Sequence, residues 1–313
     1  MNVSKRAFLG LFISAGLMCG AASTQAAGWC ESGKAVKFAG LNWESGMLLT
    51  DMMQFILKNG YGCTTDSLPG NSITMESALG SNDIQVFAEE WIGRSDAWNK
   101  AAAAGKVVGV GTPIVGATEG WYVPRFVLDK APELKTIQDL GQYAKLFRDP
   151  EEPGKGRFYN CPAGWTCELE NTEMLKKYGL EDKYTNFRPG TGPALDAAVL
   201  SSTKRKEPIL FYYWSPTPLM GQADLVKLEE PGVNKDITIQ VGLSKAFHDQ
   251  APELVAVLEK VNLPMDLLNQ NLAKMARDKI DSDKLAKSVL KEHPELWHGW
   301  VSDEAAKKID AAL

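Results

Sequence analysis

Two cysteines and one tryptophan mark the stretch of the sequence that is best suited to bind a small molecule. Segment 160–167 reads Asn-Cys-Pro-Ala-Gly-Trp-Thr-Cys, and a helical run follows it. A disulfide between Cys161 and Cys167 would close a small ring and hold Trp165 on a short, stiff loop. The first amides of the helix, from Thr166 onward, lack internal partners and attract anions. The loop therefore suits a zwitterion with a bulky cation and a carboxylate. The alternative is a stapled surface turn whose Trp165 packs into the core.

The composition limits the class of protein. A chain of 313 residues with 44% hydrophobic residues can bury a large core and form one large or two medium domains. A net charge of -5 without a long basic run argues against nucleic acid as a partner. Nine tryptophans are many for this length, so their positions carry more information than their number.

The first 27 residues predict an export signal. Two basic residues precede the apolar run 7–18, and small residues lead to a cleavage site before Ala27 or Gly28. The run is too short to span a membrane, and no later segment has the ~20 apolar residues that a span needs. We therefore expect a signal peptide over 1–27 and a soluble mature chain in the periplasm.

Cysteine usage agrees with export. Removal of the signal leaves four cysteines, and an even number in an oxidising compartment favours disulfides. Four cysteines allow three pairings, and the short spacing selects Cys161–Cys167 together with Cys30–Cys63. A zinc site is the rival interpretation, but it would want ligands paired two residues apart, which the sequence lacks. No metal and no cofactor are predicted.

The region after the signal has the order of a βαβ unit, which predicts an α/β fold. The expected elements are a strand over 36–41, a helix over 45–58 and strands over 63–68 and 84–88. The starts of the first two strands would lie side by side, which suits the Cys30–Cys63 bridge. Trp43 and Trp91 each follow a strand, and the C-terminal edge of an α/β sheet is where ligands bind. Either tryptophan alone would more often be packing than function.

A second set of strands follows a Gly-rich and Pro-interrupted segment at 112–117. Trp121 lies in the first strand of that set, and Trp214 ends a later apolar strand. The helices near the C-terminus have no strands of their own, so we expect the chain to return to its first sheet. The predicted lobes are 28–112 with 225–313, and 113–224. Trp297 and Trp300 are expected to pack in the core.

These pieces resemble a known family. The segment 161–167, the Phe-Tyr-Tyr-Trp-Ser-Pro run at 211–216 and a tryptophan after an acidic pair are similar to the glycine betaine/proline betaine-binding proteins of ABC importers. The resemblance covers essentially the whole mature chain. It implies a two-lobed periplasmic binding protein with two hinge crossovers and a ligand cleft between the lobes. It also implies a monomer that delivers its ligand to membrane permease and ATPase subunits.

The resemblance also assigns residues to the ligand. Trp91, Trp165 and Trp214 match the tryptophan box of the family, and Trp43 and Trp121 match places where some choline-binding relatives have an aromatic residue. The amides of Thr166 and Cys167 match those that help to hold a carboxylate.

The polar end of the site departs from the family pattern. Ser95, preceded by Arg94, and Thr217 stand where some relatives carry histidine, so the contacts to the anionic end are open. Glu89 and Glu90 are unusual beside a tryptophan box. They either face solvent at the edge of a helix, or one of them adds negative potential near a bound cation.

The predicted function is capture of quaternary ammonium compounds for import. Choline, carnitine, histidine and proline remain alternative ligands, and a sugar is disfavoured because few planar polar groups accompany the tryptophans. An exported hydrolase is the other class. The sequence lacks the Gly-x-Ser-x-Gly and His-Glu-x-x-His motifs, and its three histidines all lie late in the chain. We therefore expect no enzyme.

Overall fold

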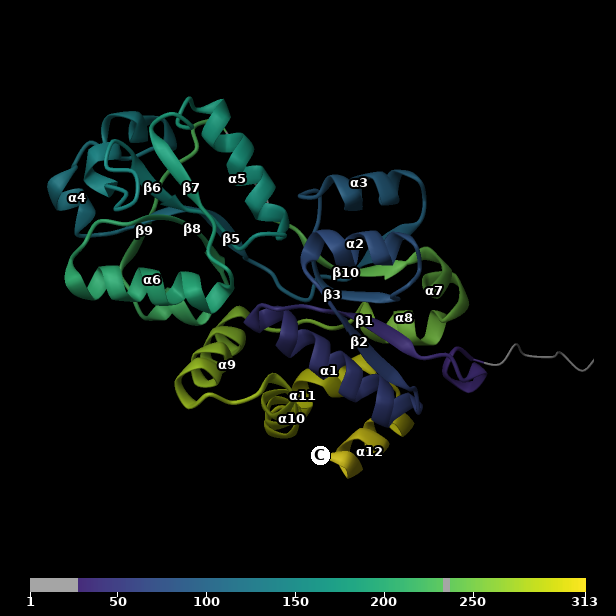
Figure 1. The fold of residues 1–313 in the computed structure, drawn as a ribbon. Helices are drawn as coiled ribbons and strands as arrows, with labels where there is room; N and C mark the ends of the chain where they lie inside the picture. Colours follow the sequence, from purple (N-terminus) through teal and green to yellow (C-terminus); the bar gives the residue numbers. More distant parts are fainter. Residues whose placement is uncertain (1–27, 233–236) are drawn as a thin grey trace, which may run out of the picture.

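Two β-sheets, each covered by helices, form the two lobes of the protein (Figure 1). The computed structural model describes residues 28–232 and 237–313, so the predicted signal peptide lies outside the described residues. The chain builds most of the first sheet, crosses to the second, and later returns to add one more strand to the first. The predicted two-lobed α/β fold is therefore confirmed.

The first sheet has the strand order β2-β1-β3-β10-β4. Strand β1 pairs in parallel with β2 and β3, whereas β10 runs antiparallel between β3 and β4. The bridge Cys30–Cys63 joins the segments that precede β1 and β2, with Cα atoms 4.6 Å apart, as the βαβ reading predicts. The strands are β1 (Val36–Gly40), β2 (Thr65–Pro69), β3 (Val86–Trp91), β4 (Val107–Val110) and β10 (Ile239–Ser244).

The second sheet has the order β7-β6-β8-β5-β9. Its parallel strands β6, β7 and β8 are joined by α5 (Thr166–Lys177) and α6 (Gly192–Arg205), so the loops after β6 and β8 lie at one edge of the sheet. Strand β5 runs antiparallel to β8 and β9. The strands are β5 (Thr118–Pro124), β6 (Gly156–Tyr159), β7 (Tyr184–Phe187), β8 (Leu210–Ser215) and β9 (Leu225–Lys227).

Helices of the C-terminal region pack beneath the first sheet. Helix α1 (Glu44–Tyr61) contacts α10 (Ser282–Glu292) and α12 (Asp303–Ala312), and Figure 1 shows this group below β1 and β2. Trp297 and Trp300 are buried in this core, as predicted. The other helices are α2 (Ser72–Gly80), α3 (Asp96–Ala103), α4 (Val127–Lys130), α7 (Lys245–Gln250), α8 (Pro252–Leu258), α9 (Met265–Asp278) and α11 (Pro294–Trp297).

The chain crosses between the two sheets twice. The first lies between β4 and β5, where it was expected. It begins at Gly111, which has φ +58°, and a Cβ there would lie 2.3 Å from the carbonyl oxygen of Glu259. Both the backbone angle and the close approach therefore require glycine. The second crossing comes later than predicted, because residues 225–227 pair with β5 as β9. The amide of Glu229 also donates to Lys135 in the second lobe, at 2.9 Å. We propose that the second lobe extends to residue 229.

Candidate functional site

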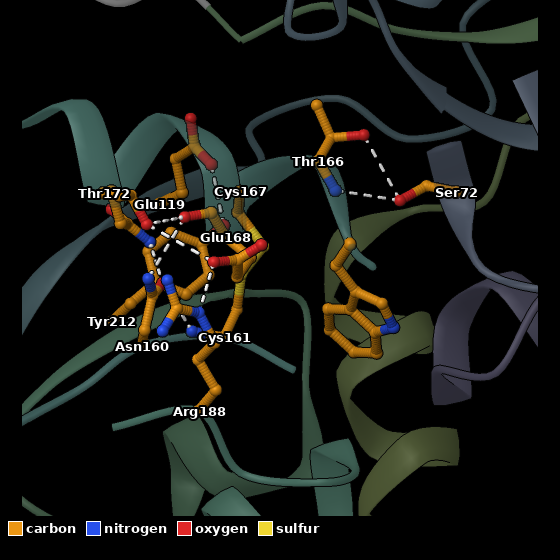
Figure 2. Close-up of a disulfide and its surroundings, with 12 residues drawn as sticks. Ser72, Glu119, Asn160, Cys161, Thr166, Cys167, Glu168, Thr172, Arg188 and Tyr212 are labelled. Carbon is orange, nitrogen blue, oxygen red and sulfur yellow. Dashed lines mark hydrogen bonds and ion pairs between the residues drawn. A yellow bond between two sulfur atoms is a disulfide. The ribbon is translucent and has the colours of Figure 1, made fainter. Parts of the chain in front are cut away.

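The predicted Cys161–Cys167 disulfide is present and staples the loop between β6 and α5 (Figure 2). The Cα atoms of the two cysteines lie 6.3 Å apart. Asn160 anchors the loop at its first residue. Its side chain donates to the carbonyl of Glu168 at 3.1 Å and to Oδ1 of Asn186 at 2.9 Å, and it accepts from the amide of Cys161 at 2.7 Å. The loop is thus held by the disulfide and by hydrogen bonds that tie it to α5 and β7.

The turn of this loop reaches the other lobe. Gly164 has φ +85°, and a Cβ there would lie 2.4 Å from the side-chain nitrogen of Asn71, which caps α2 in the first lobe. Trp165 follows the turn immediately before α5, and its indole N–H donates to Oδ1 of Asn42 in the first lobe at 3.0 Å. Only glycine combines this backbone angle with this close approach. The loop therefore presents Trp165 at the boundary between the lobes.

Four tryptophans surround one cavity between the lobes. Trp43 and Trp91 come from the first lobe, and Trp165 and Trp214 come from the second. Trp165 lies edge to face against Trp43 and Trp214, with ring centroids 5.5 Å and 5.2 Å apart. The cavity encloses about 520 Å³ with its open mouth included. A concave site with aromatic walls and a few polar groups is typical of a site for a small ligand.

Glu89 lies behind two of these tryptophans. Its Oε1 accepts hydrogen bonds from the indole N–H of Trp43 at 2.9 Å and of Trp91 at 3.0 Å. The side chain is fully buried, and this burial raises the pKa of Glu89 to about 7. The interpretation of Glu89 as a solvent-facing charge is therefore wrong. Glu89 orients two indole rings and places a titratable carboxyl at the cavity.

A β-bulge explains why Glu90 also lines the cavity. Consecutive residues of a regular strand point to opposite faces. In β3, however, Phe87 pairs with Gly242 and Glu90 pairs with Gln240, so two residues of β3 oppose a single residue of β10. Such bulges re-aim side chains near functional sites. Glu90 is 2% exposed, and its Oε2 has no hydrogen-bond partner among the described residues. A solvent-facing role is therefore wrong for Glu90 as well.

Side chains of the first lobe occupy part of the predicted anion site at the start of α5. The Thr166 amide donates to the hydroxyl of Ser72 at 3.0 Å, as Figure 2 shows, and the Thr166 hydroxyl donates to Glu76 at 3.1 Å. Ser95 also donates to Glu76 and caps α3, but it does not line the cavity. Burial raises the pKa of Glu76, while burial and the charge of Glu76 raise the pKa of Glu90 well above its usual value. Acidic groups thus gather where a carboxylate was expected to bind.

Arg94 spans the two lobes at the same end of the cavity. It follows β3 in the first lobe, and its guanidinium pairs with Glu119 of β5 and Glu170 of α5 in the second lobe. Glu119 also accepts from the hydroxyl of Tyr212, at 2.7 Å. Arg94 therefore lines the cavity, but its charge is already matched by two carboxylates of the protein.

Besides Ser95, two further predicted ligand residues lie away from this cavity. Trp121 is fully buried, stacks on Phe158 with ring centroids 4.2 Å apart, and donates to Asn171 at 2.7 Å. It lines a separate cavity inside the second lobe. The hydroxyl of Thr217 is directed at the carbonyl of Trp214, 3.5 Å away, and Thr217 is buried outside the lining of the first cavity. By contrast, Cys167 lines the cavity beside Thr166.

The structure adds residues to the cavity that sequence reasoning missed. Phe87 and Tyr212 complete its aromatic wall, and Glu76, Glu119 and Glu170 add to its acidic end. The period of a strand could have found Tyr212, which stands two residues before Trp214 in β8 and therefore shares its face. Their rings lie 6.1 Å apart and nearly parallel. The acidic residues carry no comparable signal, because they come from separate elements.

Comparison with known proteins identifies a family whose sequences match this chain. A family model for the substrate-binding domain of ABC-type glycine betaine transport systems matches residues 34–292. The chain is 25% identical over 259 residues to the glycine betaine/proline betaine-binding periplasmic protein of Escherichia coli K12, covering 74% of this chain and 78% of that protein.

Solved structures support the same fold. A glycine betaine and L-proline-binding protein from Borrelia burgdorferi superimposes with a TM-score of 0.77 at 19% identity, covering 88% of this chain and all of that chain. A choline-binding protein of an ABC transporter, in complex with choline, also has a TM-score of 0.77 at 19% identity, covering 89% of this chain and 97% of that chain. Among the described residues, none of the helices has the length and apolar character needed to cross a membrane.

Proposed function

The chain belongs to the family of substrate-binding domains of ABC-type glycine betaine transport systems. It is therefore a substrate-binding protein for compounds of the glycine betaine and choline type, and we propose that the cavity between the lobes holds them. The observation that carries the proposal is the convergence of Trp43, Trp91, Trp165 and Trp214 from both lobes on one cavity, with the carboxyl of Glu89 behind two of the rings.

The chemistry of a quaternary ammonium group explains this choice of side chains. Such a group has no N–H to donate, so a hydrogen-bond acceptor cannot select it. An aromatic face attracts the cation through its quadrupole and contributes about 0.5–2 kcal/mol when water is excluded. Several faces and the potential of Glu89 together supply a large part of the ~8 kcal/mol that a micromolar complex requires.

The transport role implies partners and a location. Membrane permease and ATPase subunits of an ABC importer would receive the ligand from the closed protein. The related Escherichia coli protein is periplasmic. We infer that residues 1–27 direct export to the periplasm and that the mature protein acts there as a monomer.

Two rival functions are less well supported. A hydrolase would need a base close to a nucleophile, but the three histidines, His248, His293 and His298, are all outside the cavity and contact surface carboxylates. Histidine or proline as ligand would leave the aromatic walls without a quaternary cation to bind. Carnitine shares the cation, so it stays a candidate within the proposed class.

Titration calorimetry of the mature protein against glycine betaine, choline, carnitine, proline and histidine tests the function. We expect micromolar binding of at least one quaternary ammonium compound and much weaker binding of the two amino acids. Binding confined to an amino acid would refute the proposal, and turnover of an ester or amide substrate would revive the hydrolase.

A further inference from the structure

The polar end of the cavity is strongly acidic. Arg94 is the single basic side chain among the described residues that line the cavity, and the acidic ones are Glu76, Glu89, Glu90, Glu119 and Glu170. Like charges at close range repel, and the repulsion is strong where water is excluded. A ligand that brings a further carboxylate to this end must therefore overcome an unfavourable potential, whereas a ligand with a net positive charge gains from it.

Two of the groups that could hold a ligand carboxylate, the guanidinium of Arg94 and the amide of Thr166, are already engaged. The guanidinium of Arg94 pairs with Glu119 and Glu170, and the amide of Thr166 donates to Ser72 at 3.0 Å. A carboxylate would have to displace these contacts before it could form its own. Displacing Arg94 would also take the guanidinium away from the buried carboxylate of Glu119, which is costly.

Glu90 places a buried hydrogen-bond acceptor at the cavity. Its side chain is 2% exposed, it lines the cavity, and its Oε2 has no partner among the described residues. A buried acceptor without a donor costs free energy that a ligand donor would recover. Glu90 sits beside Glu76, whose own oxygens accept from Ser95 and Thr166, so the neighbouring carboxyl is satisfied while Glu90 is not.

We propose that Glu90 accepts a hydrogen bond from the ligand, and that the protein thereby prefers onium compounds whose polar end is a donor, such as the quaternary ammonium alcohol choline, over those that end in a carboxylate. This inference rests on the proposed function of the tryptophan cavity. A hydroxyl both donates and accepts, so it pairs with Glu90 in either protonation state. A carboxylate pairs with Glu90 only when Glu90 is protonated.

Three probes separate the contribution of the four tryptophans, here called the tryptophan cage, from that of the polar end of the cavity. Tetramethylammonium measures the cage alone, choline adds a hydroxyl, and glycine betaine adds a carboxylate. Titration calorimetry with the wild-type protein should give choline an affinity about tenfold or more above tetramethylammonium, because the choline hydroxyl supplies the donor that the buried Oε2 of Glu90 lacks among the described residues. Glycine betaine should bind no more tightly than tetramethylammonium.

The outcomes distinguish failure of the proposed function from failure of the proposed role of Glu90. Failure of all three probes to bind would overturn the proposed function. Binding of tetramethylammonium with a clear preference for glycine betaine over choline would leave the tryptophan cage in place and overturn the role of Glu90. This comparison uses the wild-type protein, so it does not depend on the folding of any variant.

A substitution assigns the preference to one side chain. Glu90→Gln keeps the shape but replaces an acceptor oxygen with an N–H donor at every pH, so the ratio of choline to glycine betaine affinity should fall about tenfold or more. Dividing each affinity by that of tetramethylammonium for the same variant corrects for the general loss of negative potential. Asp196→Asn is the matched control, since Asp196 accepts from Tyr213 at 2.6 Å and does not line the cavity. An unchanged ratio in folded Glu90→Gln would overturn the assignment.

Discussion

The indole N–H of Trp165, on the stapled loop of the second lobe, donates a hydrogen bond to Oδ1 of Asn42 in the first lobe, 3.0 Å away. The same indole ring lies edge to face against Trp43 of the first lobe and Trp214 of the second. Trp165 therefore forms part of the cavity wall and also joins the lobes. Ligand binding and closure of the lobes share this side chain, which makes it the first position to test.

Trp165→Ala should weaken binding of the preferred quaternary ammonium ligand by ~2 kcal/mol or more, roughly thirtyfold, because the cation loses a face and gains water. Trp165→Phe should cost less, since an aromatic face remains while the hydrogen bond to Asn42 is lost. Titration calorimetry on both variants measures the difference. Equal affinity of Trp165→Ala and the wild type would return this tryptophan to a packing role.

Trp297 provides the control for that experiment. It is fully buried beneath the first sheet, away from the cavity, and its indole N–H donates to the carbonyl of Leu290 at 2.8 Å. Trp297→Ala should lower the free energy of unfolding by about 3–5 kcal/mol, as truncation of a buried aromatic does. The folded fraction should bind the ligand with nearly unchanged affinity. A large loss of affinity would mean that tryptophan substitutions act here through stability alone.

Arg94 should hold the lobes together. The guanidinium of Arg94 pairs across the cleft with Glu119 and Glu170, so Arg94→Gln removes both of these ion pairs between the lobes. We expect the ligand-free variant to be more open than the wild type, with a larger radius of gyration by small-angle X-ray scattering, and to compact when ligand is added. Identical scattering of the two ligand-free proteins would show that Arg94 does not control closure.

The sequence was sufficient to predict the features that depend on the local order of residues along the chain. The strand pattern placed Trp43 and Trp91 at one edge of the first sheet and Trp214 at an edge of the second, and in the structure Trp43 follows β1 while Trp91 and Trp214 lie in the last two positions of β3 and β8. Short spacing paired Cys161 with Cys167 correctly. Each of these inferences needed only a period, a spacing or the rule that parallel strands end at a common edge.

Features that depend on contacts between distant segments could not be predicted from the sequence. Ser72 and Thr166 are 94 positions apart, so nothing local indicated that a serine would take the amide expected to bind an anion. The bulge that turns Glu90 toward the cavity depends on its register with β10, which the alternation of β3 does not encode. The three-residue edge strand β9 was likewise too short to show a pattern in the sequence.

Loss of the loop disulfide should affect binding more than stability. Cys161 and Cys167 are 6 positions apart, and so short a ring removes little entropy from the unfolded chain beyond the loop itself. In the double variant Cys161→Ser and Cys167→Ser, we expect a small fall in melting temperature and a clear loss of ligand affinity. The matching pair Cys30→Ser and Cys63→Ser lies outside the cavity lining and should show the reverse. Equal effects on affinity would argue against a role for the staple in positioning Trp165.

The buried carboxyls at the cavity set the sign of the pH dependence of stability. Burial raises the pKa of Glu89 to about 7 and also raises the pKa of Glu76 and Glu90. The unfolded chain releases these protons near pH 4.5, whereas the ligand-free folded protein retains them to higher pH. Between these values the folded state binds more protons, so its stability should fall as the pH rises from about 5 to above 7.

A bound cation opposes this trend, because a positive charge between the tryptophan rings favours the ionised form of Glu89 and lowers its pKa. The affinity for tetramethylammonium, which has no titratable group, should therefore rise as the pH increases through about 7 and level off above it. Each unit by which the cation lowers the pKa corresponds to about tenfold in affinity. Titrations at pH 5.5, 7 and 8.5 measure the rise (buffer values chosen to bracket the pKa, roughly one and a half units either way). Glu89→Gln should flatten the part of the curve near pH 7, and an unchanged slope in that variant would assign the titration to Glu76 or Glu90 instead.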